Sequence, residues 1–371
     1  MRYALTMCVL LCCLLSASAL SAEDAWQPEK TWVFAVGVLK YEDPKLGTWP
    51  DTARVDSVLI SELKRRGVPR ERVAFLKNEQ ATITNCTKGL ELMLARTAPG
   101  DTLLFYFAGH GSRDYNDEKR PVSLMCYDSR GKDASKYWGV KQLLDSIDKG
   151  FKGANVILTA DCCHSGAIAD EAATRTKFKY GVLTSAHASS KSTGNWTFTQ
   201  ALVDMVKGSP LLDENADGKV TFKEVVAYNE IEMAFAEEQL SCHAAVGFSL
   251  ETVMSQATGK RTGKVGERIE GLSEGDWYRC KVMEEKDGKC FVTWVGWGPE
   301  WDCWVNAEEM RAYNPPIIAE GSEVQIEFEG EWYKGKVIKV QHGLHRVHYE
   351  GFTDNDDEWV PRKRLKKAKG K

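Results

Sequence analysis

Between residues 32 and 253, short apolar runs rich in β-branched and aromatic residues alternate with stretches whose apolar residues recur at helical spacing. The apolar runs predict strands at Trp32–Leu39, Val73–Leu76, Thr102–Phe107, Val156–Thr159 and Gly181–Ser185. The other stretches predict helices at Thr52–Arg66, Asn85–Arg96, Gly139–Lys149 and Phe198–Lys207. Each crossover is long enough to join parallel strands. We therefore expect an α/β domain over residues 30–257, with a mostly parallel sheet flanked by helices.

The pattern changes after residue 258, where short apolar runs alternate with tight turns and the sequence repeats itself. Trp277 recurs 55 residues later as Trp332, and Trp304 recurs as Trp359 at the same spacing. A long repeat without gaps indicates a duplicated unit. Short strands with tight turns predict that each unit is a small antiparallel β-barrel. The two predicted barrels cover residues 264–314 and 319–367.

Charge and the N-terminal pattern restrict the partners and the location. With a formal net charge of −4, the 371-residue chain has no overall attraction to polyanions, so a nucleic-acid partner is not expected. Residues 1–22 place Arg2 before an apolar run and a series of small residues, which is typical of a secretory signal. The alternative is a buried N-terminal helix, although acidic residues follow without a cap. Since no stretch is long and apolar enough for a membrane span, we expect a secreted or periplasmic protein.

Two glycine-flanked motifs follow predicted strands. The strand at 102–107 runs into AGHG, which contains His110, and the strand at 156–159 runs into ADCCHSG, which contains Cys163. Because the carboxyl ends of parallel strands meet at one edge of a sheet, we expect these two side chains to lie close together. An imidazole beside a thiol removes its proton or lowers its pKa, which makes the sulfur nucleophilic. The alternative, that both are ordinary core residues, fits glycine-flanked motifs at strand ends poorly.

The segments FYFAGHG and DCCHSG resemble the caspase and metacaspase family, over the whole predicted α/β domain. The resemblance implies a caspase-like fold and a cysteine endopeptidase, with Cys163 as the nucleophile and His110 as its base. It also implies that the backbone N–H groups of Gly111 and Cys163 stabilise the oxyanion. Cys162 stands where the family often has a small hydroxyl residue, and the side chain of His164 is expected to point away from its neighbour. Neither is expected to be catalytic.

The same resemblance implies a protein or peptide substrate that is cleaved after Arg or Lys. Asp161 matches the acid of the first specificity pocket, where a carboxylate pairs with a guanidinium group. Asp51 stands where the family has a second pocket acid, although Pro50 replaces a usual Asn and Ala108 a frequent Ser. The alternative for Asp161 is a turn or helix cap.

A calcium motif lies between the predicted helices and the barrels. Residues 213–224 satisfy the EF-hand loop pattern, with oxygen ligands at fixed positions, Gly218 at the turn and a glutamate at the last position. The expected ligands are Asp213, Asn215, Asp217, the Lys219 carbonyl, Thr221 and Glu224. The alternative is a solvated acidic turn that begins a helix. We expect Ca²⁺ and no organic cofactor.

The repeated pattern of aromatic residues, valine and glycine resembles Tudor-like and Agenet barrels of the SH3 type, which leaves the ligand of the barrels unknown. Their many aromatic residues are suited either to a cage for a cationic group or to a general peptide or surface-adhesion module. The chain is therefore expected to be a peptidase followed by two binding modules. The competing hypothesis is a catalytically inactive caspase-fold protein that binds or adheres through its barrels.

Overall fold

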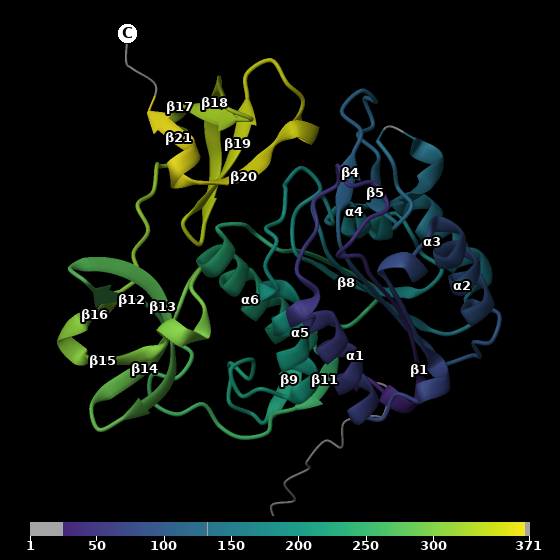
Figure 1. The fold of residues 1–371 in the computed structure, drawn as a ribbon, viewed down its shortest axis with the longest axis horizontal. Helices are drawn as coiled ribbons and strands as arrows, with labels where there is room; N and C mark the ends of the chain where they lie inside the picture. Colours follow the sequence, from purple (N-terminus) through teal and green to yellow (C-terminus); the bar gives the residue numbers. More distant parts are fainter. Residues whose placement is uncertain (1–24, 132, 368–371) are drawn as a thin grey trace, which may run out of the picture.

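The computed structural model describes residues 25–131 and 133–367, and the expected secretory signal at residues 1–22 lies outside them. Figure 1 shows one large domain with a central sheet and two small β-domains beside it. Among the described residues, no helix is long and apolar enough to cross a membrane. The large domain and the two small domains have separate sheets.

The N-terminal domain is built on a six-stranded sheet in the order β10-β8-β7-β3-β1-β2. All neighbouring strands are parallel except β10, which runs antiparallel to β8. The strands are β1 (Thr31–Gly37), β2 (Val73–Lys77), β3 (Thr102–Ala108), β7 (Asn155–Asp161), β8 (Lys179–Thr184) and β10 (Cys242–Val246). The five predicted strands are confirmed, and the antiparallel edge strand β10 was not expected.

Helices cover both faces of this sheet (Figure 1). One face carries α1 (Val55–Arg65), α5 (Thr197–Lys207) and α6 (Phe222–Glu232). The other face carries α2 (Ile83–Leu94), α3 (Val140–Gly150) and α4 (Ala167–Ala173). Of these, α4 was not predicted, because seven residues are too short for a helical period to stand out.

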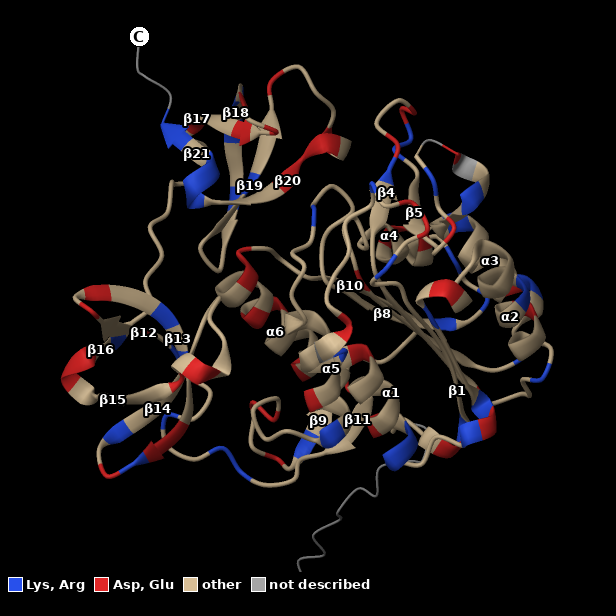
Figure 2. Ribbon diagram, viewed as in Figure 1, with Lys and Arg blue, Asp and Glu red and all other residues tan. Residues whose placement is uncertain are grey.

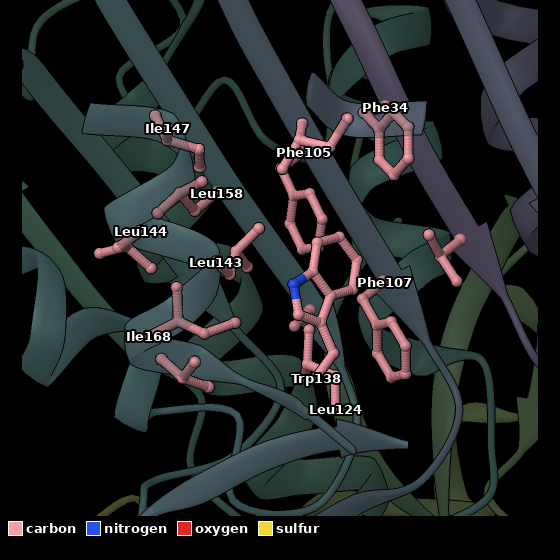
Figure 3. Packing of buried hydrophobic residues seen from close by; sticks show 14 of the residues in the cluster. Phe34, Phe105, Phe107, Leu124, Trp138, Leu143, Leu144, Ile147, Leu158 and Ile168 are labelled. Carbon is pink, nitrogen blue, oxygen red and sulfur yellow. The ribbon is translucent and has the colours of Figure 1, made fainter. Parts of the chain in front are cut away.

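Each central strand supplies side chains to both faces, because successive residues of a strand point to opposite sides. In β3, Phe105 and Phe107 pack toward α2 and α3, whereas Tyr106 packs toward α1 and α5. Trp138 is fully buried and lies edge-on to Phe105, and Figure 3 shows it surrounded by leucines of α3 and by aromatic rings of the sheet. Two hydrophobic layers thus hold the sheet rigid up to the ends of its strands.

A second, three-stranded antiparallel sheet extends from the carboxyl end of β3. It consists of β4 (Gly111–Arg113), β5 (Val122–Met125) and β6 (Tyr137–Gly139). It was not predicted, because strands of three or four residues are too short to show a clear alternation of apolar and polar residues.

The two C-terminal domains are duplicated five-stranded antiparallel barrels. Barrel 1 consists of β12 (Arg268–Ser273), β13 (Asp276–Lys286), β14 (Lys289–Trp294), β15 (Cys303–Asn306) and β16 (Met310–Ala312). Barrel 2 consists of β17 (Glu323–Phe328), β18 (Glu331–Gln341), β19 (Leu344–Tyr349), β20 (Glu358–Pro361) and β21 (Leu365–Lys367). Every strand of barrel 2 begins 55 residues after its counterpart, and both long strands carry a bulge at the same place, after Val282 and after Val337. The predicted duplication is therefore confirmed strand by strand.

Candidate active site

Adjacent strands bring the two predicted catalytic side chains to one edge of the sheet. The last residues of β3 and β7, Ala108 and Asp161, are partners in the parallel register. The backbone N–H of Gly109 then donates a hydrogen bond to the carbonyl of Asp161 at 3.3 Å. His110 lies two residues after Ala108, and Cys163 lies two residues after Asp161. The two motifs therefore leave the sheet at the same edge.

His110 is held from three sides. Its backbone N–H donates to the hydroxyl of Tyr41 at 2.7 Å, and its Nε2 lies 3.2 Å from the carbonyl oxygen of Gly47. The rings of Trp49 and Tyr41 pack on the imidazole, with centroids 4.4 Å and 5.1 Å away. Burial lowers the pKa of His110, against the opposing effect of the Gly47 carbonyl. A neutral imidazole that donates through Nε2 keeps a lone pair on Nδ1, which suits a general base.

The thiol of Cys163 is bonded to the backbone of Ser192. The Ser192 N–H donates to the sulfur at 3.2 Å, and the S–H donates to the Ser192 carbonyl at 3.6 Å. Burial raises the pKa of Cys163, and the hydrogen bond from Ser192 acts in the opposite direction. Among the hydrogen bonds of the described residues, none joins the His110 ring to the Cys163 sulfur. The two groups share one edge of the sheet, but each is bonded elsewhere.

The two neighbours of Cys163 make contacts of their own. His164 has a left-handed backbone with φ of 59°, and its Nδ1 lies 2.9 Å from the carbonyl oxygen of Ala188. Burial lowers the pKa of His164 to about 4, so it is neutral. Cys162 is buried in the core layer beneath the sheet. The described cysteines, Cys162 and Cys163 included, are all free thiols.

Asp161 lines a small pocket of about 30 Å³ next to His110. Its walls also come from the loops that follow β1 and β8, including Trp49, Asn195 and Trp196. The carboxylate is buried and accepts a hydrogen bond from the Thr199 hydroxyl at 2.6 Å. Burial raises the pKa of Asp161 to about 7, although the bonds from hydroxyl groups oppose this shift. A cationic side chain that entered this pocket would meet a carboxylate with little competing water.

Asp51 is placed differently from Asp161. Its carboxylate accepts hydrogen bonds from Arg54 at 2.9 Å and from the Asn78 amide at 3.1 Å. Arg54 in turn pairs with the buried Asp56 at 2.6 Å. Within the described chain, Asp51 is not among the residues that line the Asp161 pocket. The structure thus gives Asp51 a cationic partner of its own and does not bring it to Asp161.

Three residues that contact the catalytic pair were not identified from the sequence. Tyr41 and Trp49 lie in the loop after β1, and Ser192 lies in the loop after β8. Both strands end at the same edge as β3 and β7, which is the signal that pointed to His110 and Cys163. Nothing in the sequence of these loops indicates which of their residues fold back onto the site.

The predicted calcium ligands form a folded loop before α6. Glu224 reaches both ends of this loop, because Oε1 accepts from the Glu214 N–H at 3.0 Å and Oε2 from the Thr221 N–H at 2.8 Å. Asp213 accepts from Asp217 N–H at 3.1 Å. The other predicted ligands, Asn215 and Lys219, lie in the same loop, and Lys219–Thr221 forms a short strand, β9, paired with β11 (Val253–Gln256).

This oxygen-rich loop suits Ca²⁺ in its donor chemistry and its Gly218 turn with φ of 86°. Glu224 already binds backbone amides at both ends, so an ion would replace part of this internal pairing. Among the described residues, one group of three His, Asp or Glu side chains has ligand atoms within 4.8 Å of one another. This group is His348, Asp354 and Asp357 of barrel 2, so the acidic side chains of the loop at 213–224 are not gathered as closely.

Each barrel carries a cluster of aromatic rings at the same position. In barrel 2, Tyr333, Tyr349 and Phe352 meet edge to face, with centroids 5.9 Å to 6.0 Å apart. These rings line a pocket of about 280 Å³, and its opposite wall includes Tyr115 of the N-terminal domain. The counterparts in barrel 1 are Tyr278, Trp294 and Trp297.

Comparisons with known proteins agree with both halves of this arrangement. Residues 35–172 match the family described as "Metacaspase, peptidase C14 domain", and residues 318–366 match "Histone methyltransferase Tudor domain". Metacaspase-2 of Trypanosoma brucei brucei is 29% identical over 126 residues, which cover 30% of this chain and 35% of that protein. Metacaspase-3 of the same organism is 29% identical over 30% of this chain and 34% of its own length. The chain thus spans about a third of the length of these curated relatives.

Among solved structures, Caspase-1 from Spodoptera frugiperda aligns with a TM-score of 0.38 and 14% identity, over 62% of this chain and 93% of that one. The family match covers His110 and Cys163, and the Tudor match covers barrel 2 from before β17 into β21. Residues 35–172 are therefore metacaspase-like, and residues 318–366 are Tudor-like.

Proposed function

We propose that this chain is a cysteine endopeptidase that cleaves after Arg or Lys, with Cys163 as the nucleophile and His110 as the base. The register of β3 and β7 carries the proposal, because it sets an imidazole and a thiol level at the edge of one rigid sheet. The family match of residues 35–172 supports a cysteine peptidase at the level of the family. Arg or Lys specificity rests on the buried carboxylate of Asp161.

The reaction begins when the imidazole of His110 takes the proton of the Cys163 thiol. The sulfur then attacks the carbonyl carbon of the scissile peptide, and the carbonyl oxygen becomes an oxyanion, to which the N–H groups of Gly111 and Cys163 donate. The C–N bond breaks as His110 returns the proton to the leaving amine. Water, activated by the same imidazole, attacks the thioester and releases the acid and the free thiol.

Substrate selection follows from the pocket beside this pair. The Asp161 carboxylate lies one residue from Cys162 and two from the nucleophile, at the end of a rigid strand. An Arg or Lys side chain that binds Asp161 fixes the following peptide bond near Cys163. Binding of a cation also favours the ionised carboxylate, which offsets its cost of burial.

The loop at residues 213–224 is proposed to bind Ca²⁺ through Asp213, Asn215, Asp217, the Lys219 carbonyl, Thr221 and Glu224. The bound ion would supply a positive charge that ties the two ends of the loop together in front of α6. Its proposed role is structural, since the loop connects α5 to α6 and contains neither His110 nor Cys163.

The enzyme is also proposed to be secreted, because residues 1–22 have the pattern of a cleaved signal. N-terminal sequencing of protein from the culture medium of the host is the test. A mature chain that begins after Ala19 or Ala22 supports secretion, and an intact Met1 in a protein retained by cells contradicts it.

Covalent labelling tests the peptidase directly. A peptidyl-arginine chloromethyl ketone reacts only where a pocket binds its arginine side chain next to a nucleophile. It should therefore alkylate Cys163 in the wild type. The aspartyl analogue should label far more slowly, and Cys163→Ala should not be labelled at that peptide. Equal labelling by the two probes would refute Arg specificity. An inactive caspase-fold binding protein, the competing hypothesis, would show no probe-dependent label at Cys163.

A further inference from the structure

We propose that barrel 2, docked on the N-terminal domain, restrains the loop at residues 187–192 and thereby keeps the Cys163 thiol in a resting arrangement. Barrel 2 is then an intramolecular regulator of the nucleophile. The proposal rests on the proposed function in one respect, the identity of Cys163 as the nucleophile. Its evidence is a continuous series of contacts from the barrel to the sulfur.

The first part of this series is the loop itself, which is bonded to the nucleophile and its neighbour. Ser192 binds the sulfur of Cys163 through both its N–H and its carbonyl group. The backbone N–H of His164 donates to the Ser190 carbonyl at 2.9 Å, and its ring bonds to the Ala188 carbonyl. As long as these bonds persist, the thiol proton is directed to Ser192 and not to His110.

The second part is the set of contacts between barrel 2 and the same loop. The hydroxyl of Ser189 donates to the Asp357 carbonyl at 2.5 Å. The ammonium group of Lys191 lies 3.0 Å from a carboxylate oxygen of Glu329 and 5.9 Å from the centre of the Phe328 ring. Two residues of the loop that precede Ser192 are therefore attached to the barrel.

The third part is the set of contacts between barrel 2 and the segment that follows His110. Arg113, at the end of β4, donates to the Asn355 carbonyl at 2.5 Å, and its side chain is only 5% exposed. Arg120 donates to the Asp356 carboxylate at 3.2 Å. Figure 2 shows the acidic turn at residues 354–357 as a red segment of barrel 2 on the side of the N-terminal domain. Barrel 2 thus bonds to the chain on both sides of the candidate dyad.

An apolar contact anchors the barrel. Leu344 and Trp359 of barrel 2 form a buried cluster with Ala234 and Leu240. The ring of His187, where the restrained loop begins, lies 6.4 Å from the ring of Trp359. The exposed Lys191–Glu329 pair contributes little by itself, so the restraint depends on this cluster and on the buried Arg113 and its partner turn.

Transfer of the thiol proton to His110 requires the hydrogen bond from the S–H to the Ser192 carbonyl to break. The loop cannot turn this carbonyl away from the sulfur while Ser189 and Lys191 are attached to the barrel. The docked position of barrel 2 therefore favours the thiol bonded to Ser192, and the undocked position favours a thiol that can reach His110. A ligand that prefers the undocked barrel raises the reactivity of Cys163, and one that prefers the docked barrel lowers it.

The test uses the full mature chain and a reaction that needs no peptidase activity. The variant Asp356→Lys places a cation against Arg113 and Arg120 and should release barrel 2. The control, Asp354→Lys, makes the same charge change in the same turn, where the side chain is 94% exposed and does not touch either arginine. Iodoacetamide alkylation of Cys163, followed by peptide mass spectrometry, gives the rate for this thiol alone.

We expect Asp356→Lys to alkylate Cys163 about ten-fold faster than the wild type and to increase the radius of gyration in X-ray scattering. Asp354→Lys should match the wild type in both measurements. Release of the barrel without faster alkylation would overturn the proposal, as would equal rates in the two variants. If alkylation accelerates but no variant cleaves peptides, the restraint stands and the peptidase function fails.

Exchanging the charges of Glu329 and Lys191 provides a second test, which remains valid if Asp356→Lys fails to fold. Glu329→Lys replaces a weak attraction to Lys191 with a repulsion, so it should raise the alkylation rate by less than Asp356→Lys does. The double variant Glu329→Lys/Lys191→Glu should restore the rate toward the wild-type value. Glu274, in barrel 1, occupies the equivalent turn with the same φ of 52° and is exposed, so Glu274→Lys is the matched control. Failure of the exchange to reverse the effect counts against the restraint.

Discussion

The backbone of Gly111 lies directly against the carbonyl group of Cys163. A Cβ atom at position 111 would lie 1.8 Å from that carbonyl oxygen and 2.9 Å from the carbonyl carbon. This approach ties the segment after His110 to the segment that carries the nucleophile. It gives the glycine of the AGHG motif a steric reason that does not depend on backbone freedom, because the neighbour is backbone and cannot rotate away.

Gly111→Ala should therefore separate the two segments. We expect the free energy of unfolding to fall by about 3 kcal/mol, as for an overpacked core, and peptidase activity to be lost. Chemical denaturation and peptide hydrolysis measure the two effects. The control is Gly139→Ala, where φ is −59° and the nearest atom to an added Cβ is 3.8 Å away. Similar behaviour of the two variants would show that the close approach is not structurally important.

The raised pKa of Asp161 gives folding stability a specific pH dependence. Burial is the main cause of the shift from the ordinary value of 3.8 to about 7. The folded protein therefore holds this proton more tightly than the unfolded chain, and Asp161 costs stability as pH rises from about 4 to about 7. Denaturation of wild type and Asp161→Asn across this range should show the wild type losing stability relative to the variant. An unchanged difference between pH 4 and pH 8 would contradict the shift.

The same carboxylate should control the binding of basic substrates. In the inactive Cys163→Ala background, an Arg peptide should bind more tightly as pH rises through about 7, because the ionised form of Asp161 then predominates. Adding Asp161→Asn should weaken binding by about 100-fold at pH 8 and abolish this pH dependence. Asp51→Asn provides the comparison, since Asp51 is paired with Arg54. Calorimetric titration gives the affinities. An equal loss of affinity in both variants would show that the Asp161 pocket does not select the basic side chain of the substrate.

Tyr41 is expected to act as a positioning residue for His110. Its hydroxyl accepts the His110 N–H, and its ring packs on the imidazole. Tyr41→Phe should cost about 1 kcal/mol of stability and lower kcat about ten-fold, with little change in KM. Tyr180→Phe loses a hydroxyl bond to Asp148 at the opposite end of the sheet and should leave kcat unchanged. If kcat falls equally in both, the effect is on stability alone.

Calcium should stabilise the chain through the loop at residues 213–224. An ion concentration 100 times the dissociation constant should add about 2.7 kcal/mol to the free energy of unfolding. Glu224→Gln should abolish this gain, because Glu224 is the ligand that closes the loop. Glu214→Gln changes an exposed side chain outside the ligand positions and should retain the gain. Thermal denaturation with Ca²⁺ and with EDTA provides the comparison, and a gain that survives Glu224→Gln places the ion elsewhere.

The sequence was sufficient for features that depend on a periodic pattern. β3 and β7 are long, apolar and followed directly by their chemical motifs, so the placement of His110 and Cys163 at one edge of the sheet followed from the topology of a parallel sheet. The barrel repeat was equally accessible, because a constant offset of 55 residues survives into every strand. In both cases, local pattern and tertiary structure agree.

Features that depend on loop conformation were not accessible in this way. The bonds of Ser192 to the thiol and of Tyr41 to His110 arise where loops after different strands fold over one edge of the sheet. The docking of Asp356 on Arg120 joins residues 236 positions apart, and neither lies in a recognisable motif. Such contacts are set by packing of whole domains, so composition and spacing carry no signal for them.

Peptide hydrolysis by the mature protein shows whether Cys163 is the nucleophile of a peptidase that cleaves after Arg or Lys. Fluorogenic peptides that differ only in Arg, Lys or Asp before the scissile bond should be assayed with and without Ca²⁺, beside Cys163→Ala purified in the same way. We expect the wild type to cleave the Arg and Lys peptides at least about 1,000-fold faster than Cys163→Ala does, and not to cleave after Asp. Turnover that persists in Cys163→Ala, or that occurs only after Asp, would contradict it.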